Sequence, residues 1–474
     1  MSENRYIKDH AQEKSLFLSR IIISSLVGLF LICIIVIRLF QLQIIEYDFF
    51  NQKAQGNRVN LRATLPPRGS IFDRNGKVLA ENITAFQLEL IPEQVENLND
   101  SLERLLTLNL IKQNQIKNIK QQVISSQKFR PIRLRSNLND QEIAVFAANR
   151  ANFSGIELQP RLVRNYPQKE FTSHVVGYVG SISKQDQSRL NQSLYNPNEK
   201  TGKTGTELFN EVVLHGEPGY YQFIANSRGR EIPLNQDEMN SNLLQNKAAN
   251  PGSDIFLSID LDLQKLATQL LDGRRGSVVA IDPNNGEVLA LVSSPSFDPN
   301  IFNNNLSSET YDALQKNTDQ PLFNRAVLGT YSPGSTIKPI LGLAALQLGV
   351  VNLTHRHICR GHFTLPGNTH RYRDWLPTGH GSVNLHNAIA QSCDVFFYEI
   401  GGQIGIDRMH NYLDQFGLGQ KTNIELTGER DGLIPSTLWK KTMFSKNEDK
   451  TWFPGETVIA SIGQGYMLAT PLQL

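Results

Sequence analysis

The sequence predicts an α+β fold behind a single membrane-spanning helix. Three observations support this prediction. Residues 21–37 form an uncharged apolar run, residues 276–295 form two apolar β runs joined by a Pro-Asn-Asn-Gly turn, and helical patterns dominate from residue 337 onward. Strands followed by helices, without regular alternation, are typical of α+β domains.

Composition limits the classes of function. The chain has 474 residues, too many for one ordinary core, so we expect two or three domains. Hydrophobic residues make up 40% of the chain and charged residues 19%, as in a folded protein. Because the formal net charge is only +2, composition gives no indication of a nucleic-acid partner.

The apolar run predicts a retained membrane anchor over residues 21–45. It continues nearly apolar after Arg38, and a bilayer needs roughly 20 such residues as a helix. A buried core helix would show a polar face, and a cleaved signal peptide would end in small residues. Basic residues in the leader, residues 1–20, favour a cytoplasmic N-terminus and an exported remainder. They are Arg5, Lys8, Lys14 and Arg20.

Residues 46–250 combine strand-like and helical stretches. Pro66-Pro67 forbids helix, and residues 73–76, Asp-Arg-Asn-Gly, have hairpin-turn chemistry. Helical spacing follows over residues 101–123, and strand-like runs return over residues 155–180. The stretch 235–254 is rich in Asn, Gln, Gly and Pro, which predicts a linker.

A second domain is predicted over residues 251–474. Residues 254–271 indicate a short strand and then a helix, and the hairpin of residues 276–295 follows. Apolar helical patterns then predict helices over Ile337–Leu348 and over Leu385–Ile404.

Three Ser-x-x-Lys sites place a hydroxyl and an amine one helical turn apart, where a neutral lysine can take the serine proton. Ser125 and Ser181 lie in polar stretches, so we expect solvated surface pairs there. Ser335 follows a Ser-Pro-Gly turn and opens an almost wholly apolar helix. Free N–H groups and the helix dipole favour negative charge at that position, and burial favours a neutral Lys338. The alternative is an ordinary helix N-terminus with solvated caps.

Several segments, in this order, resemble class B penicillin-binding proteins, the D,D-transpeptidases that crosslink peptidoglycan. The segments are RLFQLQ after the anchor, PPRGSIFDRNG (66–76), RNYP with HVVGYVG (164–180), PSFDPNIF (295–302), NRAVLGTYSPGSTIKP (324–339) and IGQGYMLATPLQ (462–473). Within the family, the elongation-type branch is the most similar. The segments that resemble it are YRDW (372–375), GHG (379–381) and SCDVFFYEIG (392–401).

The resemblance implies an elongated β-rich pedestal domain and then a transpeptidase domain like those of penicillin-binding proteins and β-lactamases. Ser335 would be acylated by the penultimate D-Ala carbonyl of a donor stem peptide, with Lys338 as general base. Ser392 would relay a proton toward the leaving amine, and Asp394 would orient this network. An amine of a neighbouring stem peptide would resolve the acyl-enzyme, and β-lactams would imitate the donor.

The family also carries a Lys-Thr/Ser-Gly box on an active-site edge strand, some tens of residues after residues 462–473. Because the chain ends at Leu474, we expect a transpeptidase domain without its C-terminal part and with little activity. Two earlier copies, Lys200–Gly202 and Lys203–Gly205, precede Ser335 and are expected to form a flexible turn before a helix. They do not fit a phosphate-binding loop either, since Pro197 stands where its first glycine should be.

A possible metal site is indicated by six of the ten histidines, which crowd between His355 and His386 beside two cysteines. Four residues there offer the thiolate, imidazole and carboxylate ligands of a structural tetrahedral zinc. They are Cys359, Asp374, His380 and Cys393. Their spacing is irregular, so a Cys359–Cys393 disulfide and unbonded thiols remain as alternatives. No organic cofactor is expected.

The resemblance also implies partners and a location. Peptidoglycan stem peptides and β-lactams would be the ligands, in a protein held in the inner membrane with its bulk in the periplasm. A polytopic glycan polymerase would contact the anchor and the pedestal. The main alternative is a catalytically impaired, membrane-anchored scaffold that activates this polymerase. A β-lactam-sensing receptor would need a cytoplasmic signalling domain, for which the leader is too short.

Overall fold

The computed structural model describes residues 10–46, 59–126, 128, 131–191, 194–195, 199–224, 246–303 and 308–474. The start of the predicted leader and residues 235–245 of the predicted linker lie outside the described residues. The chain separates into two compact units, each described by itself below.

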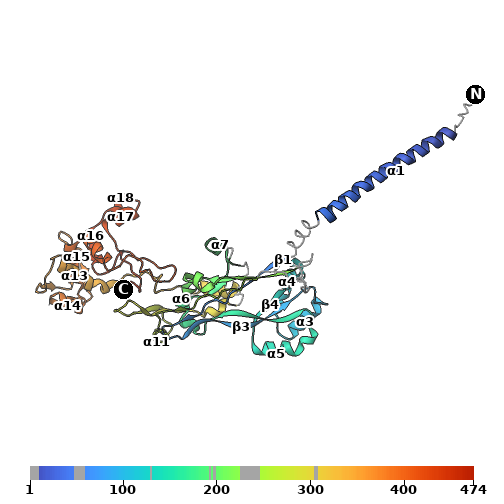
Figure 1. The fold of residues 1–474 in the computed structure, drawn as a ribbon. Coiled ribbons are helices and arrows are strands. Elements are labelled where there is room, and N and C mark those ends of the chain that lie inside the picture. The colour runs from blue at the N-terminus through green and yellow to red at the C-terminus, as the bar shows by residue number, and fades with distance from the viewer. Residues whose placement is uncertain are drawn as a thin grey trace, which may run out of the picture. The chain divides into compact units, whose positions relative to one another are not determined.

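The smaller unit contains the predicted anchor. Helix α1 (His10–Phe40) continues as a π-helical turn, η1 (Gln41–Ile45), and is drawn in dark blue in Figure 1. Its stretch Arg20–Ile45 is long and apolar enough to cross a membrane. The same unit holds a two-stranded antiparallel ribbon, in which β1 (Val59–Thr64) pairs with β8 (Gly219–Ile224).

The larger unit begins with a five-stranded sheet. Its strands are β2 (Ile71–Phe72), β3 (Val78–Leu90), β4 (Ile132–Leu138), β5 (Ile156–Asn165) and β9 (Ile255–Phe256). The strand order is β4-β3-β2-β9, with β5 also paired to β3. The predicted turn between β2 and β3 is confirmed, since Asp73 Oδ1 accepts the Asn75 and Lys77 N–H groups and Gly76 has a φ of 80°.

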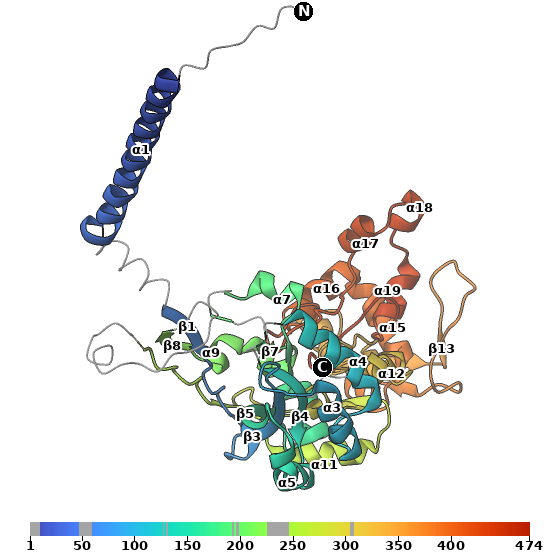
Figure 2. The same cartoon turned by 90° about the vertical axis from the view of Figure 1, so that its right-hand side faces the viewer.

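Three helices bury their apolar sides against this sheet. They are α3 (Leu98–Thr107), α4 (Gln113–Ser125) and α5 (Asp140–Asn149), with a 3₁₀ turn, η2 (Arg150–Asn152), after the last. In Figure 2 they lie beside β3, β4 and β5. Leu88 and Leu90 of β3 share one core cluster with Leu102 and Leu105 of α3. The helical pattern predicted over residues 101–123 is confirmed as two helices, α3 and α4, with a break at residues 108–112.

The doubled Lys-Thr-Gly stretch is not the flexible turn that we expected. Its first copy is strand β7 (Lys200–Gly202), which pairs with β6 (Val179–Ser181). Gly202 donates its N–H to Glu211 Oε2 at 2.7 Å, and any side chain on Gly202 would clash with the Glu207 carbonyl. Tight packing therefore holds this copy extended. The Lys203 ammonium of the second copy contacts Asp186.

Short helices lie before, between and after these two strands in the sequence. They are η3 (Lys169–Phe171), α6 (Ser173–Val176), α7 (Lys184–Arg189), α8 (Gly205–Phe209) and α9 (Glu211–His215). The predicted helix after the second Lys-Thr-Gly is confirmed as α8 and α9, which meet at Asn210.

A buried ionic cluster links these segments. Arg68 Nε lies 2.6 Å from Glu207 Oε2, and its Nη2 lies 2.8 Å from Glu211 Oε2. Arg164 Nε lies 2.7 Å from Glu207 Oε1. Glu207 is fully buried, so its charge is stabilised by the two guanidinium groups and not by water. Residues that are far apart in the sequence are held together here.

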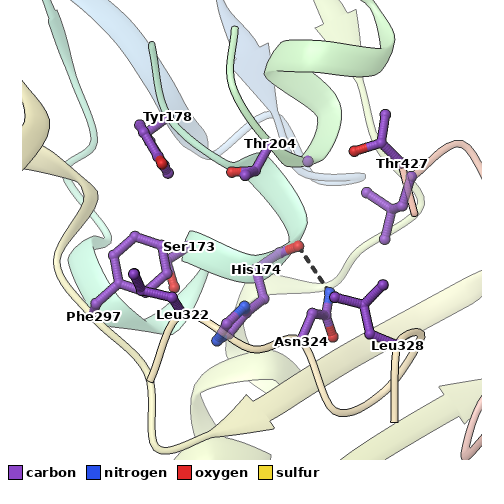
Figure 3. Close-up of a pocket in the computed structure, with 11 residues that line it drawn as sticks. Ser173, His174, Tyr178, Thr204, Phe297, Leu322, Asn324, Leu328 and Thr427 are labelled. Atoms are coloured by element: carbon purple, nitrogen blue, oxygen red, sulfur yellow. Dashed lines mark hydrogen bonds between the residues drawn. The ribbon is translucent and has the colours of Figure 1, made fainter. Parts of the chain in front are cut away.

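A cavity of about 100 Å³ lies beside α6 (Figure 3). His174 and Tyr178 come from the region of α6, and Asn324 donates its side-chain amide to the His174 carbonyl at 3.2 Å. The lining residues are Ser173, His174, Tyr178, Thr204, Gly205, Phe297, Leu322, Asn324, Leu328, Leu426 and Thr427. Neither Ser335 nor Lys338 lines this cavity.

The C-terminal part begins with strands and continues with helices, as predicted. Helix α11 (Leu261–Leu271) packs on the hairpin of β10 (Gly276–Ile281) and β11 (Val288–Ser294). Next come η4 (Pro299–Phe302), α12 (Ser308–Lys316), η5 (Gly334–Ile337) and α13 (Lys338–Gln347). Two small ribbons follow: β12 (His357–Cys359) with β15 (Gly381–Val383), and β13 (His362–Phe363) with β14 (Tyr372–Arg373).

Six helices follow in the described stretch 385–474, and four of them share one hydrophobic cluster with α13. The six are α14 (Leu385–Ala390), α15 (Asp394–Ile404), α16 (Ile406–Asp414), α17 (Thr437–Met443), α18 (Asn447–Lys450) and α19 (Pro454–Ala460). The four in the cluster are α14, α15, α16 and α19. Helix α15 is central, because it packs against α13, α14, α16 and α19. Its Phe396 and Phe397 are fully buried in the shared core. The α+β class predicted from the sequence is confirmed.

Candidate active site

Ser335 and Lys338 lie at the start of one helical segment. The 3₁₀ turn η5 contains Ser335 and leads directly into α13, whose first residue is Lys338. Side chains three residues apart in a 3₁₀ turn lie on the same side. The predicted difference in environment is present, since Ser335 is exposed and the Lys338 side chain is only 1% exposed.

The turn before Ser335 is held by two glycines. Gly334 has a φ of 60° and donates its N–H to the Gly463 carbonyl at 2.9 Å. Gly463 has a φ of 71°, and a side chain on it would clash with the Gly334 backbone. The segment that contains Gly463 thus fixes the backbone immediately before the candidate nucleophile.

The Lys338 ammonium has three partners at the start of α15. Its Nζ donates to the Ser392 carbonyl at 2.9 Å, to Ser392 Oγ at 3.1 Å and to Asp394 Oδ1 at 2.6 Å. These three bonds use the three donors that a protonated lysine has. Burial of this charge is therefore compensated by one carboxylate and two neutral oxygens.

The prediction of a single helix over Leu385–Ile404 is wrong. The segment is broken between α14 and α15, and Ser392 in the break has a φ of 52°. The left-handed region is unfavourable for a residue with a side chain, and such strain is often found at functional sites. The apolar pattern runs through both helices, so it carried no sign of the break.

The break brings the Ser392 hydroxyl to Ser335. Ser392 Oγ donates to Ser335 Oγ at 2.9 Å and accepts from Lys338 Nζ. A continuous path therefore runs from the Lys338 amine through Ser392 to the exposed Ser335 hydroxyl. The structure brings together all four residues that the sequence predicted for this site, namely Ser335, Lys338, Ser392 and Asp394.

Trp375 is a further neighbour that the sequence interpretation did not assign to the site. Its backbone N–H donates to Asp394 Oδ2 at 3.2 Å, so Asp394 has Lys338 on one oxygen and Trp375 on the other. Its indole Nε1 donates to the Gln391 carbonyl at 3.0 Å. The sequence signal was weak: a tryptophan next to a candidate metal ligand, in a segment without helical or strand periodicity.

The four predicted metal ligands also meet. Their ligand atoms all lie within 4.8 Å of one another, and the thiols of Cys359 and Cys393 are free. Cys359 Sγ lies 3.5 Å from Asp374 Oδ2 and 3.6 Å from His380 Nδ1, and His380 Nδ1 lies 3.5 Å from Asp374 Oδ1. Bonds of zinc to nitrogen, oxygen and sulfur place tetrahedral ligands about 3.3–3.8 Å apart. The donor types and these three distances are compatible with zinc.

The four candidate metal ligands are connected through the backbone to the segment Ser392–Asp394 of the candidate active site. Cys393 stands between Ser392 and Asp394, and Asp374 Oδ2 accepts the Val395 N–H of α15 at 3.1 Å. Burial acts to raise the pKa of Asp374, but the N–H groups of Leu376 and Val395 outweigh it, and the pKa is lowered. Burial raises the pKa of the Cys393 thiol.

The arrangement suits acyl transfer. An exposed serine at a helix N-terminus, connected to a buried lysine through a second hydroxyl, has the geometry of a nucleophile that a neutral lysine can activate. The class of protein that this site defines is a serine enzyme that passes through an acyl intermediate.

Comparison with known proteins agrees with this class. Residues 63–257 match the penicillin-binding protein dimerisation domain, and residues 276–474 match the penicillin-binding protein transpeptidase domain. The peptidoglycan D,D-transpeptidase MrdA of Acinetobacter baumannii is 41% identical over the whole chain, which spans 69% of the length of that relative.

The similar solved structures include two complexes. Penicillin-binding protein 2 of Helicobacter pylori, in complex with MreC, has 30% identity and a TM-score of 0.72, over 88% of this chain and 76% of its own. A chain of a peptidoglycan synthase complex, studied for the coordination of polymerization and crosslinking, has 29% identity and a TM-score of 0.66. That match covers 96% of this chain and 76% of the other.

The chain belongs to the penicillin-binding proteins, with a dimerisation and a transpeptidase domain. Its relatives place it with the penicillin-binding protein 2 type, the peptidoglycan D,D-transpeptidases that the elongation-type resemblance predicted.

Proposed function

We propose that Ser335 is the nucleophile of this transpeptidase and that Lys338, Ser392 and Asp394 control its proton. The observation that carries the proposal is the path from Lys338 Nζ through Ser392 Oγ to Ser335 Oγ. When Lys338 is neutral, the two links can run in the opposite sense, and the Ser335 proton passes through Ser392 to Nζ. Asp394 stabilises the ammonium that results.

In the first half of the reaction, Ser335 Oγ attacks the carbonyl carbon of the penultimate D-Ala of a donor stem peptide. The C–N bond to the terminal D-Ala breaks, and Ser392 passes the stored proton to the leaving amine. In the second half, an amine of a neighbouring stem peptide attacks the ester. The new amide forms, the ester C–O bond breaks, and Ser335 regains its proton.

Covalent labelling tests these roles. Fluorescent penicillin should acylate the detergent-solubilised chain at Ser335, and Ser335→Ala should abolish the label. Ser181→Ala is a matched control, because Ser181 belongs to another Ser-x-x-Lys pattern, on the surface. Peptide mapping that finds the label on any residue other than Ser335 would contradict the assignment.

We also propose that Cys359, Asp374, His380 and Cys393 hold a structural zinc ion. The support is the burial and mutual spacing of the four ligand atoms. When bound, zinc would supply a four-ligand cross-link between the segment of Asp374 and the start of α15. Cys393 would then be held as a thiolate despite its burial.

Elemental analysis of the purified chain should find one zinc per molecule, and His380→Ala should lower this ratio. His370→Ala is a control, since His370 lies in the same histidine-rich stretch outside the cluster. A count of reactive thiols under denaturing, non-reducing conditions tells free cysteines from a disulfide. Zinc-free protein with a Cys359–Cys393 disulfide would refute the proposal.

For location and partners, we propose an inner-membrane anchor with a cytoplasmic N-terminus, a periplasmic bulk and a polytopic glycan polymerase as partner. The apolar helix Arg20–Ile45 and the basic leader support the topology. The similarity to a chain of a peptidoglycan synthase complex supports the partner. Protease should reach the bulk of the chain in spheroplasts, and replacing the anchor with an unrelated span should weaken co-purification of the polymerase.

A further inference from the structure

Trp375 is an unusual tryptophan for its position. The residue is 62% exposed, although it contacts Gln391 and Asp394 on either side of Ser392, whose hydroxyl donates to Ser335. The other two tryptophans, Trp439 and Trp452, pack among aromatic rings in the region of α17 to α19. An apolar ring in water gains free energy when a ligand covers it.

The exposed ring is not free to move. Its Nε1 donates to the Gln391 carbonyl, one residue before Ser392, and its backbone N–H donates to Asp394 Oδ2. The ring also lies 5.5 Å from the ring of His380, centroid to centroid. Both donors are therefore satisfied by residues that flank Ser392, and much of the residue is still exposed to solvent.

A rigid aromatic face is a suitable contact surface for a ligand. Little conformational entropy is lost when a ligand covers a side chain that is already held in one orientation. Aromatic faces pack well against aliphatic chains and offer no hydrogen bond that would compete with the reacting groups. The bond to the Gln391 carbonyl holds the indole next to Ser392, whose hydroxyl donates to Ser335.

We infer that Trp375 is a substrate-positioning residue whose indole face packs against the aliphatic portion of the donor stem peptide, on the residue that precedes the penultimate D-Ala. This inference rests on the proposed function, because it takes Ser335 as the acylated residue. The reacting D-Ala carbonyl meets Ser335, and the residue before it extends along the Ser392 loop, where Trp375 lies.

A second possibility is that Trp375 only braces the loop through its Nε1 bond to Gln391. Two variants separate the roles. Trp375→Phe keeps an aromatic face and removes the side-chain donor, whereas Trp375→Gln keeps a donor and removes the face. The backbone N–H bond to Asp394 is present in both.

The test measures Ser335 acylation by intact mass in a single turnover, with two thioester donors. One donor is N-acetyl-D-alanine thioester, and the other carries a residue with a long aliphatic side chain before the same D-alanine. Trp375→Gln should weaken binding of the extended donor about tenfold, with a limiting rate near that of the wild type. In the same variant, binding of the acetyl donor should change less than about twofold. In Trp375→Phe, binding of both donors should stay within about threefold of the wild type.

The control is Leu353→Gln, which also replaces an exposed apolar side chain, 74% exposed, beyond the far end of α13. It should leave both donors unchanged. If Trp375→Phe lowered the limiting acylation rate equally with both donors, Trp375 would only stabilise the loop through its Nε1 bond. That result would overturn the inference. So would unchanged binding of the extended donor in Trp375→Gln. If wild-type protein is not acylated at Ser335 at all, the proposed function fails and this inference fails with it.

Discussion

Lys338 and Asp394 form an ion pair that joins the first turn of α13 to the first turn of α15. Nζ lies 2.6 Å from Oδ1, and the two side chains are only 1% and 14% exposed. The residues are 56 positions apart in the sequence. Because the pair is largely shielded from water, its charges depend on each other far more than those of a surface pair.

Asp394→Asn should slow acylation of Ser335 by about one to two orders of magnitude, because the Lys338 ammonium loses the charge that stabilises it. The thermal unfolding midpoint should also fall, since a buried charge is left unpaired. Stopped-flow acylation and thermal scans measure the two effects. Asp312→Asn breaks the exposed Asp312–Lys316 pair and should change neither. Equal effects of the two substitutions would contradict this account of the buried pair.

Ser392→Ala and Ser392→Gly should both slow acylation by about 10²–10⁴-fold, because each removes the hydroxyl between Lys338 and Ser335. Their stabilities should differ. Glycine adopts a φ of 52° without strain, so Ser392→Gly should be more stable than Ser392→Ala by about 1 kcal/mol. Chemical denaturation measures that difference. An alanine variant as stable as the glycine variant would argue against a left-handed Ser392.

Glu207→Gln should lower the free energy of unfolding by about 3–5 kcal/mol, because Arg68 and Arg164 lose their shared buried carboxylate. Glu287→Gln is the matched control, since its pair with Arg74 is about two-fifths exposed on both sides and should contribute about 0–1 kcal/mol. Urea unfolding compares the two variants. Similar midpoints would show that the cluster contributes little.

His174 should make the fold less stable as the pH falls. Burial, and then the charge of Arg325, lowers the pKa of His174 to about 4. An unfolded histidine takes up a proton near pH 6.5, so between pH 6.5 and 4 the unfolded state binds more protons. This group therefore removes up to about 1.4 kcal/mol of stability per pH unit over that window.

His174→Gln should remove this part of the pH dependence and leave the rest of the profile unchanged. Chemical denaturation at several pH values between 7 and 4 measures it. His370→Gln, which replaces an exposed histidine, is the control. If the free energy of unfolding of the wild type and of His174→Gln depended on pH in the same way, the histidine would titrate alike in the folded and unfolded states.

Features with a local cause could be predicted from the sequence. The long apolar helix near the N-terminus, the turn at residues 73–76 and the β10–β11 hairpin rest on residue types a few positions apart, and all three are present. The same holds for the contrast between the exposed Ser335 and the buried Lys338, which follows from a helix that is polar only at its start.

Features caused by packing between distant segments could not be predicted from the sequence. The break at Ser392 is hidden in a continuous apolar pattern, because both α14 and α15 bury one side in the same core. The strand at Lys200–Gly202 was missed because its extended form depends on Glu207 and Glu211 packing against Gly202. Turn-like residue types within the stretch pointed the other way.

The sequence by itself determined the apolar N-terminal helix, the order of strands and helices, and the residue types available for chemistry, since each depends on a short stretch of chain. Only the tertiary structure decided that Ser392 stands between Lys338 and Ser335, and that Trp375 lies against the same loop. Those residues come from separate segments, with Ser335 and Ser392 57 positions apart. They meet because α13 and α15 pack into one hydrophobic core, and the contacts within that core are not encoded in any local pattern.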